Sequence, residues 1–183
     1  MKIPPHAKRV FQGTIFEVYQ WDQEMFDGSS ATFEALKRPD TIQIIPTNKD
    51  TLFLSHEEQP NKPLSYCFLG GRQEEGEEPL VVAKRELLEE SGMESDDWEL
   101  LKTYESEGKI QWTTYFFVAR NAKKITVPHL DPGEKITVEE VSFEQFLAIL
   151  DRDDFWGKNI AHDIHMLTHD TEKLTEFKKK LFV

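Results

Sequence analysis

The chain has 183 residues, 38% of them apolar and 31% charged, which is enough for one well-buried globular domain and too short for two ordinary ones. A formal net charge of −12 disfavours binding to a nucleic-acid backbone, although an acidic protein still acts on phosphates when divalent cations intervene. No apolar run approaches the ~18 residues of a membrane span, the N-terminus lacks the apolar segment of a secretory signal, and the single cysteine, Cys67, excludes an intramolecular disulfide. We therefore expect a cytoplasmic protein that binds neither nucleic acid nor membranes.

The N-terminal part of the chain is rich in β-forming residues. The extended runs 15–21 and 31–36 flank a turn cluster at 27–30, and the runs 41–45 and 51–55 flank a second one at 48–50. A short buried strand is then expected over residues 66–69, just before the glycines at 70 and 71. A helix is predicted next over residues 79–91, with Pro79 in the tolerated first turn and Gly92 as its stop.

The C-terminal part continues with strands and ends in helices. Residues 98–104 and 110–119 are extended, and alternate side chains of the second run fall on one face. Ser142 opens a helix through its capping-box spacing with Gln145, and a last helical region covers residues 159–181. This order of elements predicts an α/β fold in which helices pack on a mixed sheet.

The segment over residues 71–93, GRQEEGEEPLVVAKRELLEESGM, carries the chemistry. Glu86 and Glu90 are one helical turn apart on one face, with Glu89 beside them. Carboxylates packed this closely repel one another, and a hard divalent cation such as Mg²⁺ or Mn²⁺ makes the cluster favourable. The segment therefore predicts a metal site on the polar face of the helix.

Neighbouring residues are expected to position these carboxylates. The opposite side of the helix is expected to bury against the sheet through Leu80, Ala83 and Leu87. Arg85 lies four residues before Glu89 and is expected to pair with it. Gly70 and Gly71 leave a strand end and allow backbone carbonyls to approach a ligand or metal without interference from a Cβ atom.

The same segment matches every specified position of the Nudix box, Gx5Ex7REUxEExGU with U aliphatic, so the chain resembles the Nudix hydrolase family. The matched residues are Gly71, Glu77, Arg85, Glu86, Leu87, Glu89, Glu90, Gly92 and Met93. The resemblance implies the Nudix fold, an α/β/α sandwich around a mixed β-sheet. It also implies hydrolysis of a nucleoside diphosphate linked to another group, with Mg²⁺ as the cofactor and Mn²⁺ as a substitute.

Carried over onto this sequence, the resemblance assigns roles to individual residues. The metal ligands that it implies are Glu86, Glu89, Glu90 and the Gly70 carbonyl. The residues that it makes structural within the motif are Gly71, Glu77 and Gly92. The catalytic candidates are Glu89, Arg85 and Glu134. Glu134 lies in an acidic Pro-Gly loop over residues 131–136, where ADP-ribose pyrophosphatases carry a late glutamate as base or extra ligand.

Residues 9–38 resemble, in length and β character, the N-terminal region with which many ADP-ribose pyrophosphatases build a dimer. We therefore expect an N-terminal β extension over residues 1–38, a Nudix hydrolase domain over residues 39–183, and a homodimer through the extension. The small nucleotide-derived substrate that the resemblance favours is ADP-ribose or a nucleotide sugar, cleaved to AMP or another nucleoside monophosphate and a sugar phosphate.

Two alternatives stay open on the sequence. Those pyrophosphatases commonly have a Ser-Pro-Gly-like element after the box, whereas residues 104–109 read YESEGK here. Trp112 falls near the position of an aromatic residue in dinucleoside polyphosphate hydrolases. A nucleoside triphosphate or dinucleoside polyphosphate hydrolase is therefore one alternative, and a non-catalytic nucleotide-binding Nudix module is the other.

Basic and aromatic residues outside the acidic helix complete the candidates. The basic residues expected near a diphosphate are Arg38, Lys62 and Arg72. Trp112 is a candidate for substrate binding and also for the sheet core. Phe155 and Trp156 offer rings that either stack on a base or anchor the last helix.

Overall fold

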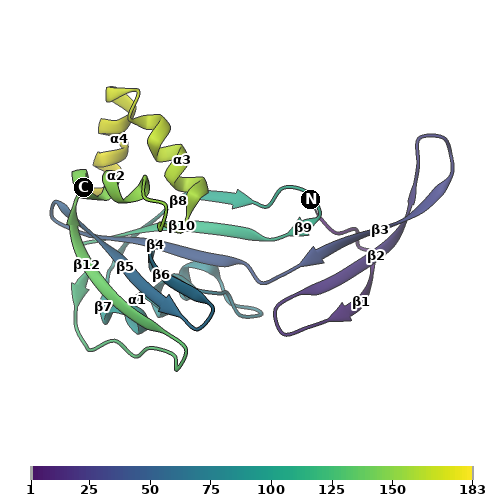
Figure 1. The fold of residues 1–183 in the computed structure, drawn as a ribbon, viewed down its shortest axis with the longest axis horizontal. Helices are drawn as coiled ribbons and strands as arrows, with labels where there is room; N and C mark the ends of the chain where they lie inside the picture. The colour runs from purple at the N-terminus through teal and green to yellow at the C-terminus, as the bar shows by residue number, and fades with distance from the viewer. Residues whose placement is uncertain (1, 183) are drawn as a thin grey trace.

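The computed structural model describes residues 2–182, whose strands form two larger sheets in one elongated molecule (Figure 1). The N-terminal sheet, at the right of Figure 1, has the strand order β1-β2-β3-β9. Its strands are β1 (Lys8–Gln12), β2 (Glu17–Glu24), β3 (Ser30–Lys37) and β9 (Ile110–Gln111). Strand β9 comes from the middle of the chain, so the chain leaves the N-terminal sheet after β3 and returns to it at β9.

The main sheet has the order β12-β5-β4-β10-β8, with β6 paired to β5. Its strands are β4 (Thr41–Asn48), β5 (Thr51–Gln59), β6 (Lys62–Cys67), β8 (Asp97–Glu105), β10 (Thr113–Arg120) and β12 (Lys135–Ser142). Strands β4 and β10 run parallel and the other pairs antiparallel, so the predicted mixed sheet is confirmed. Two further short strands, β7 (Met93–Glu94) and β11 (Lys123–Lys124), pair with each other.

Helices cover both faces of the main sheet. Helix α1 (Pro79–Ser91) packs on one face, and α2 (Phe143–Leu150), α3 (Lys158–Leu167) and α4 (Thr171–Phe182) pack on the other (Figure 1). The alternation along β10 explains the two cores, because Phe117 and Ala119 face α1 whereas Phe116 and Val118 face the other helices. The expected α/β/α sandwich is therefore confirmed. No helix within residues 2–182 has the length and apolarity needed to cross a membrane.

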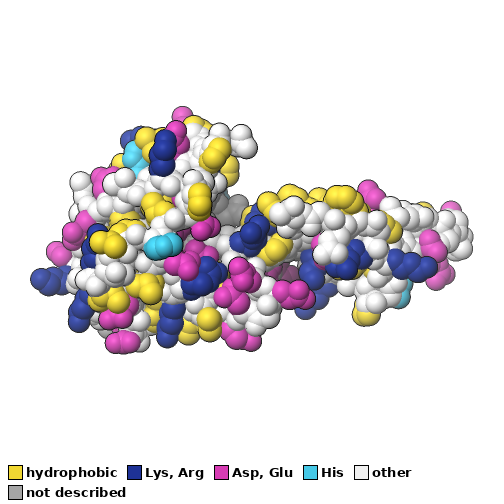
Figure 2. All heavy atoms as spheres, turned by 90° about the horizontal axis from the view of Figure 1, so that it is seen from below, with side chains coloured by type: hydrophobic (Ala, Val, Ile, Leu, Met, Phe, Trp, Pro, Cys, Tyr) yellow, Lys and Arg dark blue, Asp and Glu magenta, His cyan; other side chains and the backbone are white. Residues whose placement is uncertain are grey.

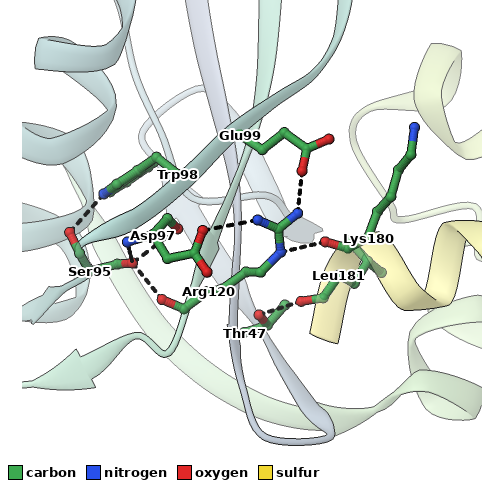
Figure 3. Close-up of polar contacts among 8 residues, drawn as sticks. All are labelled: Thr47, Ser95, Asp97, Trp98, Glu99, Arg120, Lys180 and Leu181. Carbon is green, nitrogen blue, oxygen red and sulfur yellow. Dashed lines mark hydrogen bonds and ion pairs between the residues drawn. The ribbon is translucent and has the colours of Figure 1, made fainter. Parts of the chain in front are cut away.

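The last turn of α4 is tied to the main sheet by side chains that satisfy its carbonyl groups (Figure 3). Thr47 Oγ1 donates to the Leu181 carbonyl at 2.7 Å, and Arg120 Nε donates to the Lys180 carbonyl at 2.6 Å. The Arg120 guanidinium also pairs with the carboxylates of Asp97 and Glu99. Arg120 is buried, so this cluster fixes the C-terminal helix against β4, β8 and β10.

Three expectations about local structure are wrong in detail. The extended run 110–119 is interrupted at Trp112, because Gln111 pairs with Lys37 of the N-terminal sheet whereas Thr114 pairs with Thr41 of the main sheet. The helical region 159–181 is interrupted over residues 168–170, where the Asp170 carboxylate accepts the Lys173 N–H and caps α4.

The third correction concerns the buried face of α1. Leu80 is 37% exposed, although Ala83 and Leu87 are buried as expected. Val82 packs into the core instead. Leu80 lies in the first turn, next to Pro79, and is not part of the core that Val82, Ala83 and Leu87 build.

Candidate active site

The carboxylates of α1 line a cavity of about 800 Å³ at the junction of the main sheet and the N-terminal sheet. Val82, Ala83 and Leu87 bury the other side of the helix, so Glu86, Glu89 and Glu90 are presented from a rigid element. Figure 2 shows acidic and basic side chains gathered side by side on the surface near this junction. The predicted acidic face therefore opens into this cavity.

Glu90 is the most deeply placed of these three carboxylates, with 6% of its surface exposed. Gly70 N–H donates to Glu90 Oε2 at 2.7 Å, which joins the loop before α1 to the helix. Burial raises the pKa of the Glu90 carboxyl well above its ordinary value, and the nearby carboxylates of Glu86 and Glu57 raise it further. A carboxylate in this position is stabilised by a bound cation.

Arg85 braces the remaining acids of the motif. Its Nη1 atom lies 2.9 Å from oxygens of both Glu86 and Glu89, and its Nη2 atom lies 3.4 Å from Glu77. The predicted pair of Arg85 with Glu89 is present, and the same guanidinium also holds Glu77. Glu77 in turn accepts the Glu74 N–H at 2.9 Å, which fixes the turn that leads into the helix.

Other atoms crowd the Cβ positions of two adjacent glycines in this loop. Gly70 has φ 135°, and a Cβ atom on it would lie 2.2 Å from the Ile42 carbonyl oxygen. A Cβ atom on Gly71 would lie 2.3 Å from Glu86 Oε1. Gly92 ends α1 as its C-cap, with its N–H donating to the Leu88 carbonyl.

The donor set fits a hard divalent cation. Glu86 and Glu90 provide carboxylate oxygens, and the loop adds a backbone carbonyl at Gly70, since the carbonyls of Leu69 and Gly71 are already bonded to β4. Within residues 2–182, no three His, Cys, Asp or Glu side chains converge closely enough to hold an ion as they stand. Arg85 contacts one oxygen each of Glu86 and Glu89, which leaves the second oxygen of both carboxylates for an ion.

One end of the cavity brings together the three predicted substrate-binding residues. The Arg38 guanidinium lies 4.4 Å from the Trp112 ring centroid and 5.9 Å from that of Phe16. The Trp112 indole donates to Thr41 Oγ1 at 3.0 Å, and Arg72 is bridged to Thr41 through the backbone. Arg38 Nε is buried without a hydrogen-bond partner in the described chain, and burial together with the Arg72 charge lowers the Arg38 pKa. The neighbouring charges of Arg38 and Arg72 therefore suit this end of the cavity to an anionic ligand.

The loop after β11 brings Glu134 to the same cavity. Its backbone is anchored on α1, because His129 N–H donates to the Glu89 carbonyl at 2.7 Å and Ile125 N–H donates to that of Gly92 at 2.8 Å. Glu134 lines the cavity, and burial raises the pKa of its carboxyl. The Pro-Gly turn seen in the sequence thus places Glu134 among the box carboxylates.

Glu57, on β5, is a cavity residue that the sequence analysis missed. It is buried, it pairs with Lys62 at 3.4 Å, and its charge raises the pKa values of Glu90 and Glu134. The overlooked signal was the turn at Pro60 and Asn61, which folds β6 back on β5. The strand predicted over residues 66–69 runs instead from Lys62 to Cys67. Lys62 is in register with Gln59, and its side chain reaches Glu57 on the same strand, β5.

Comparisons with known proteins agree with this arrangement. The NUDIX domain model matches residues 37–163. Methanol dehydrogenase activator of Bacillus methanolicus is 29% identical over 150 residues, covering 79% of this chain and 80% of that protein. ADP-ribose pyrophosphatase of Bacillus subtilis (strain 168) is 26% identical over 165 residues, covering 87% of this chain and 89% of that protein.

A solved structure supports the same fold. The crystal structure of an ADP compounds hydrolase aligns with a TM-score of 0.69 and 22% identity, covering 91% of this chain and 94% of that one. The family model spans more than half of the chain and includes the complete acidic motif on α1. The chain therefore belongs to the Nudix family and is a Nudix hydrolase.

Proposed function

We propose that this Nudix hydrolase cleaves the diphosphate of ADP-ribose or a nucleotide sugar and that Mg²⁺ is its cofactor, with Mn²⁺ able to substitute. ADP-ribose would give AMP and ribose 5-phosphate. The observation that carries the proposal is one cavity that holds both the box carboxylates and the paired Arg38 and Trp112. The first group suits a metal-bound diphosphate and the second suits a nucleoside with its phosphate.

The proposed ligands of the ion are Glu86, Glu90 and the Gly70 carbonyl, with Glu89 as a further ligand. When bound, Mg²⁺ neutralises the diphosphate charge and lowers the pKa of a water molecule. Arg85 orients Glu86 and Glu89 through its two 2.9 Å contacts. Arg38 and Arg72 hold the diphosphate oxygens, and Trp112 orients the nucleoside.

We assign the general base to Glu134 in preference to Glu89. A base must accept the proton of the attacking water at a free carboxylate oxygen. Arg85 engages an oxygen of Glu89 in an ion pair, whereas burial raises the pKa of Glu134. Replacing Glu134 by Gln is therefore expected to lower kcat more than replacing Glu89.

The experiment is a phosphate-release panel with Mg²⁺, run with and without added phosphatase. Its substrates are ADP-ribose, UDP- and GDP-sugars, NADH, diadenosine polyphosphates and nucleoside triphosphates. Turnover of ADP-ribose to monophosphate products supports the proposal. A preference for triphosphates would favour the alternative of a nucleoside triphosphate hydrolase. No turnover of any substrate by a folded, Mg²⁺-binding protein would favour a non-catalytic binding module.

We also propose a homodimer through the N-terminal extension, residues 1–38, which we separate from the hydrolase domain at 39–183. Strand β1 is an edge strand, and apolar side chains on and after it are exposed, including Val10, Phe11 and Phe16. A second copy that pairs at this edge would cover them. Deleting residues 1–38 is expected to give a monomer by light scattering, with weaker substrate binding. A monomeric intact protein contradicts the assembly.

The cellular location belongs to the same proposal. Cys67 is buried and free, which suits a reducing compartment. We place the hydrolase in the cytoplasm, where nucleoside diphosphate derivatives and Mg²⁺ are both present. Fractionation of cells that express the tagged protein tests this placement.

A further inference from the structure

The cavity carries a second pair of a cation and an aromatic ring, away from Arg38 and Trp112. Lys62 Nζ lies 4.8 Å from the Trp156 ring centroid, and both residues line the cavity. The chain segment 66–72 runs from one pair to the other. At one end Tyr66 forms a β-bridge with Phe155, the neighbour of Trp156, and at the other end Arg72 forms one with Thr41, which binds the Trp112 indole. This segment spans at most about 20 Å, and its two glycines adjoin the box carboxylates. The two pairs therefore flank the acidic centre.

Trp156 is held in place by its backbone while the residue stays 53% exposed. The backbone N–H of Trp156 donates to the Tyr66 carbonyl at 2.8 Å, and the backbone N–H of Tyr66 donates to the Asp154 carbonyl at 2.9 Å. The preceding Phe155 is buried, with its ring edge-on to Phe68 at 5.2 Å. Phe155 is thus the packing anchor, and Trp156 is left as a fixed, half-open aromatic surface on the cavity wall.

The ammonium group of Lys62 is fixed beside this surface. It pairs with Glu57 at 3.4 Å and lies 3.2 Å from Cys67 Sγ. These contacts engage two of its three N–H donors, which leaves one for a ligand oxygen. Because Glu57 neutralises Lys62, this end of the cavity suits a neutral ring with a hydrogen-bond acceptor better than a terminal phosphate.

We infer that Lys62 and Trp156 form a subsite for a second nucleoside, so that the substrate class is a dinucleotide with a central diphosphate. This inference rests on the proposed function, since the same carboxylates must hold the diphosphate. The base would stack on the Trp156 indole, and Lys62 would donate to an oxygen of the base or its ribose. A bare ribose, as in ADP-ribose, leaves most of the indole plane uncovered.

NADH and ADP-ribose provide the test, because they share the adenylate half and differ in the second base. We would measure kcat/KM for both substrates with Mg²⁺ on the full-length wild type, Trp156→Ala and Trp156→Phe. Trp156→Ala is expected to lose about 5- to 150-fold on NADH, the range of one stacked base, and to change less than about 2-fold on ADP-ribose. Trp156→Phe keeps a smaller ring and is expected to lose less on NADH.

A matched control is Trp112→Ala, which removes the ring assigned to the shared half and is expected to lower kcat/KM for both substrates alike. The subsite is overturned if wild type does not cleave NADH or if Trp156→Ala leaves NADH turnover unchanged. It is also overturned if Trp156→Ala lowers kcat/KM equally for NADH and ADP-ribose. Should Trp156→Ala misfold, the comparison of Trp156→Phe with wild type decides in the same way. Wild type that cleaves neither substrate refutes the proposed function itself, whereas normal ADP-ribose turnover with no effect of Trp156 refutes the subsite alone.

Discussion

The backbone N–H of Gly70 donates to Oε2 of Glu90 at 2.7 Å, and this bond joins the loop before α1 to a buried carboxylate on its last turn. The contact satisfies one oxygen of Glu90 and leaves its charge otherwise uncompensated by hydrogen bonds within residues 2–182. Loop, helix and carboxylate therefore form one unit, which we propose a cation completes.

Replacing Glu90 by Gln tests that unit. The amide keeps the shape and an oxygen for the Gly70 N–H, but it removes the charge of a ligand. We expect kcat to fall about 100-fold or more, since even outer-shell partners of metal sites are worth ~10–100-fold. The melting temperature should hold or rise, because a buried charge is removed. Glu107→Gln, at an exposed position outside the cavity, is the matched control. Near wild-type activity of Glu90→Gln at limiting Mg²⁺ would contradict the metal assignment.

Gly71→Ala tests the close approach of the loop to Glu86. The new Cβ atom would lie 2.3 Å from Glu86 Oε1 and would push that carboxylate away. We expect weaker Mg²⁺ binding by calorimetry and lower activity, with a modest change in melting temperature. Gly133→Ala is the control, because no atom lies within 4 Å of the Cβ position there. Equal metal affinity in both variants would remove Glu86 from the site.

Arg120→Ala tests the attachment of α4 to the sheet. The change leaves the Lys180 carbonyl and two carboxylates without their donor, which we expect to cost about 2–3 kcal/mol of unfolding free energy. Urea denaturation measures this loss. Arg152→Ala removes an exposed pair with Asp154, which solvent screens, and is expected to cost clearly less than Arg120→Ala. A similar loss of unfolding free energy in the two variants would show that the burial of Arg120 adds no stability.

The buried thiol of Cys67 gives a prediction for pH. Burial raises the pKa of Cys67 to about 11, so at pH 8 only about one thiol in a thousand is ionised. We expect iodoacetamide to label the native protein far more slowly than the urea-unfolded chain. Because the folded pKa is raised, the stability that this group contributes is present below about pH 8.5 and is lost as the pH rises toward 11. Cys67→Ala should lose less stability over that range, and rapid labelling of native protein at pH 8 would contradict the burial.

Much of the site could be predicted from local spacing. Glu86 and Glu90 share a face because a helix repeats every 3.6 residues, and Arg85 reaches Glu89 for the same reason. Pro79 and Gly92 mark the ends of that helix through their own backbone preferences. The first turn was the exception, since the burial of Leu80 depended on where the helix meets the sheet.

Residues brought together by long-range strand pairing were predicted less well. The break at Trp112 arises because β9 and β10 join different sheets, and the alternation of residues 110–119 carries no sign of it. The turn before α4 was missed because a short capped break leaves the helical periodicity almost unchanged.

The amino-acid sequence by itself determined the family and the acidic helix with its cluster of carboxylates, because these depend on residue types at fixed spacings along one element. The tertiary structure alone decided that Glu57 joins the site, that Lys62 pairs with it, and that Trp156 and not Phe155 stands on the cavity wall. It also decided that Arg38 stacks on Trp112, across 74 positions of sequence (112 − 38). Such contacts follow from sheet register and loop closure, which bring distant segments together and which no local pattern encodes.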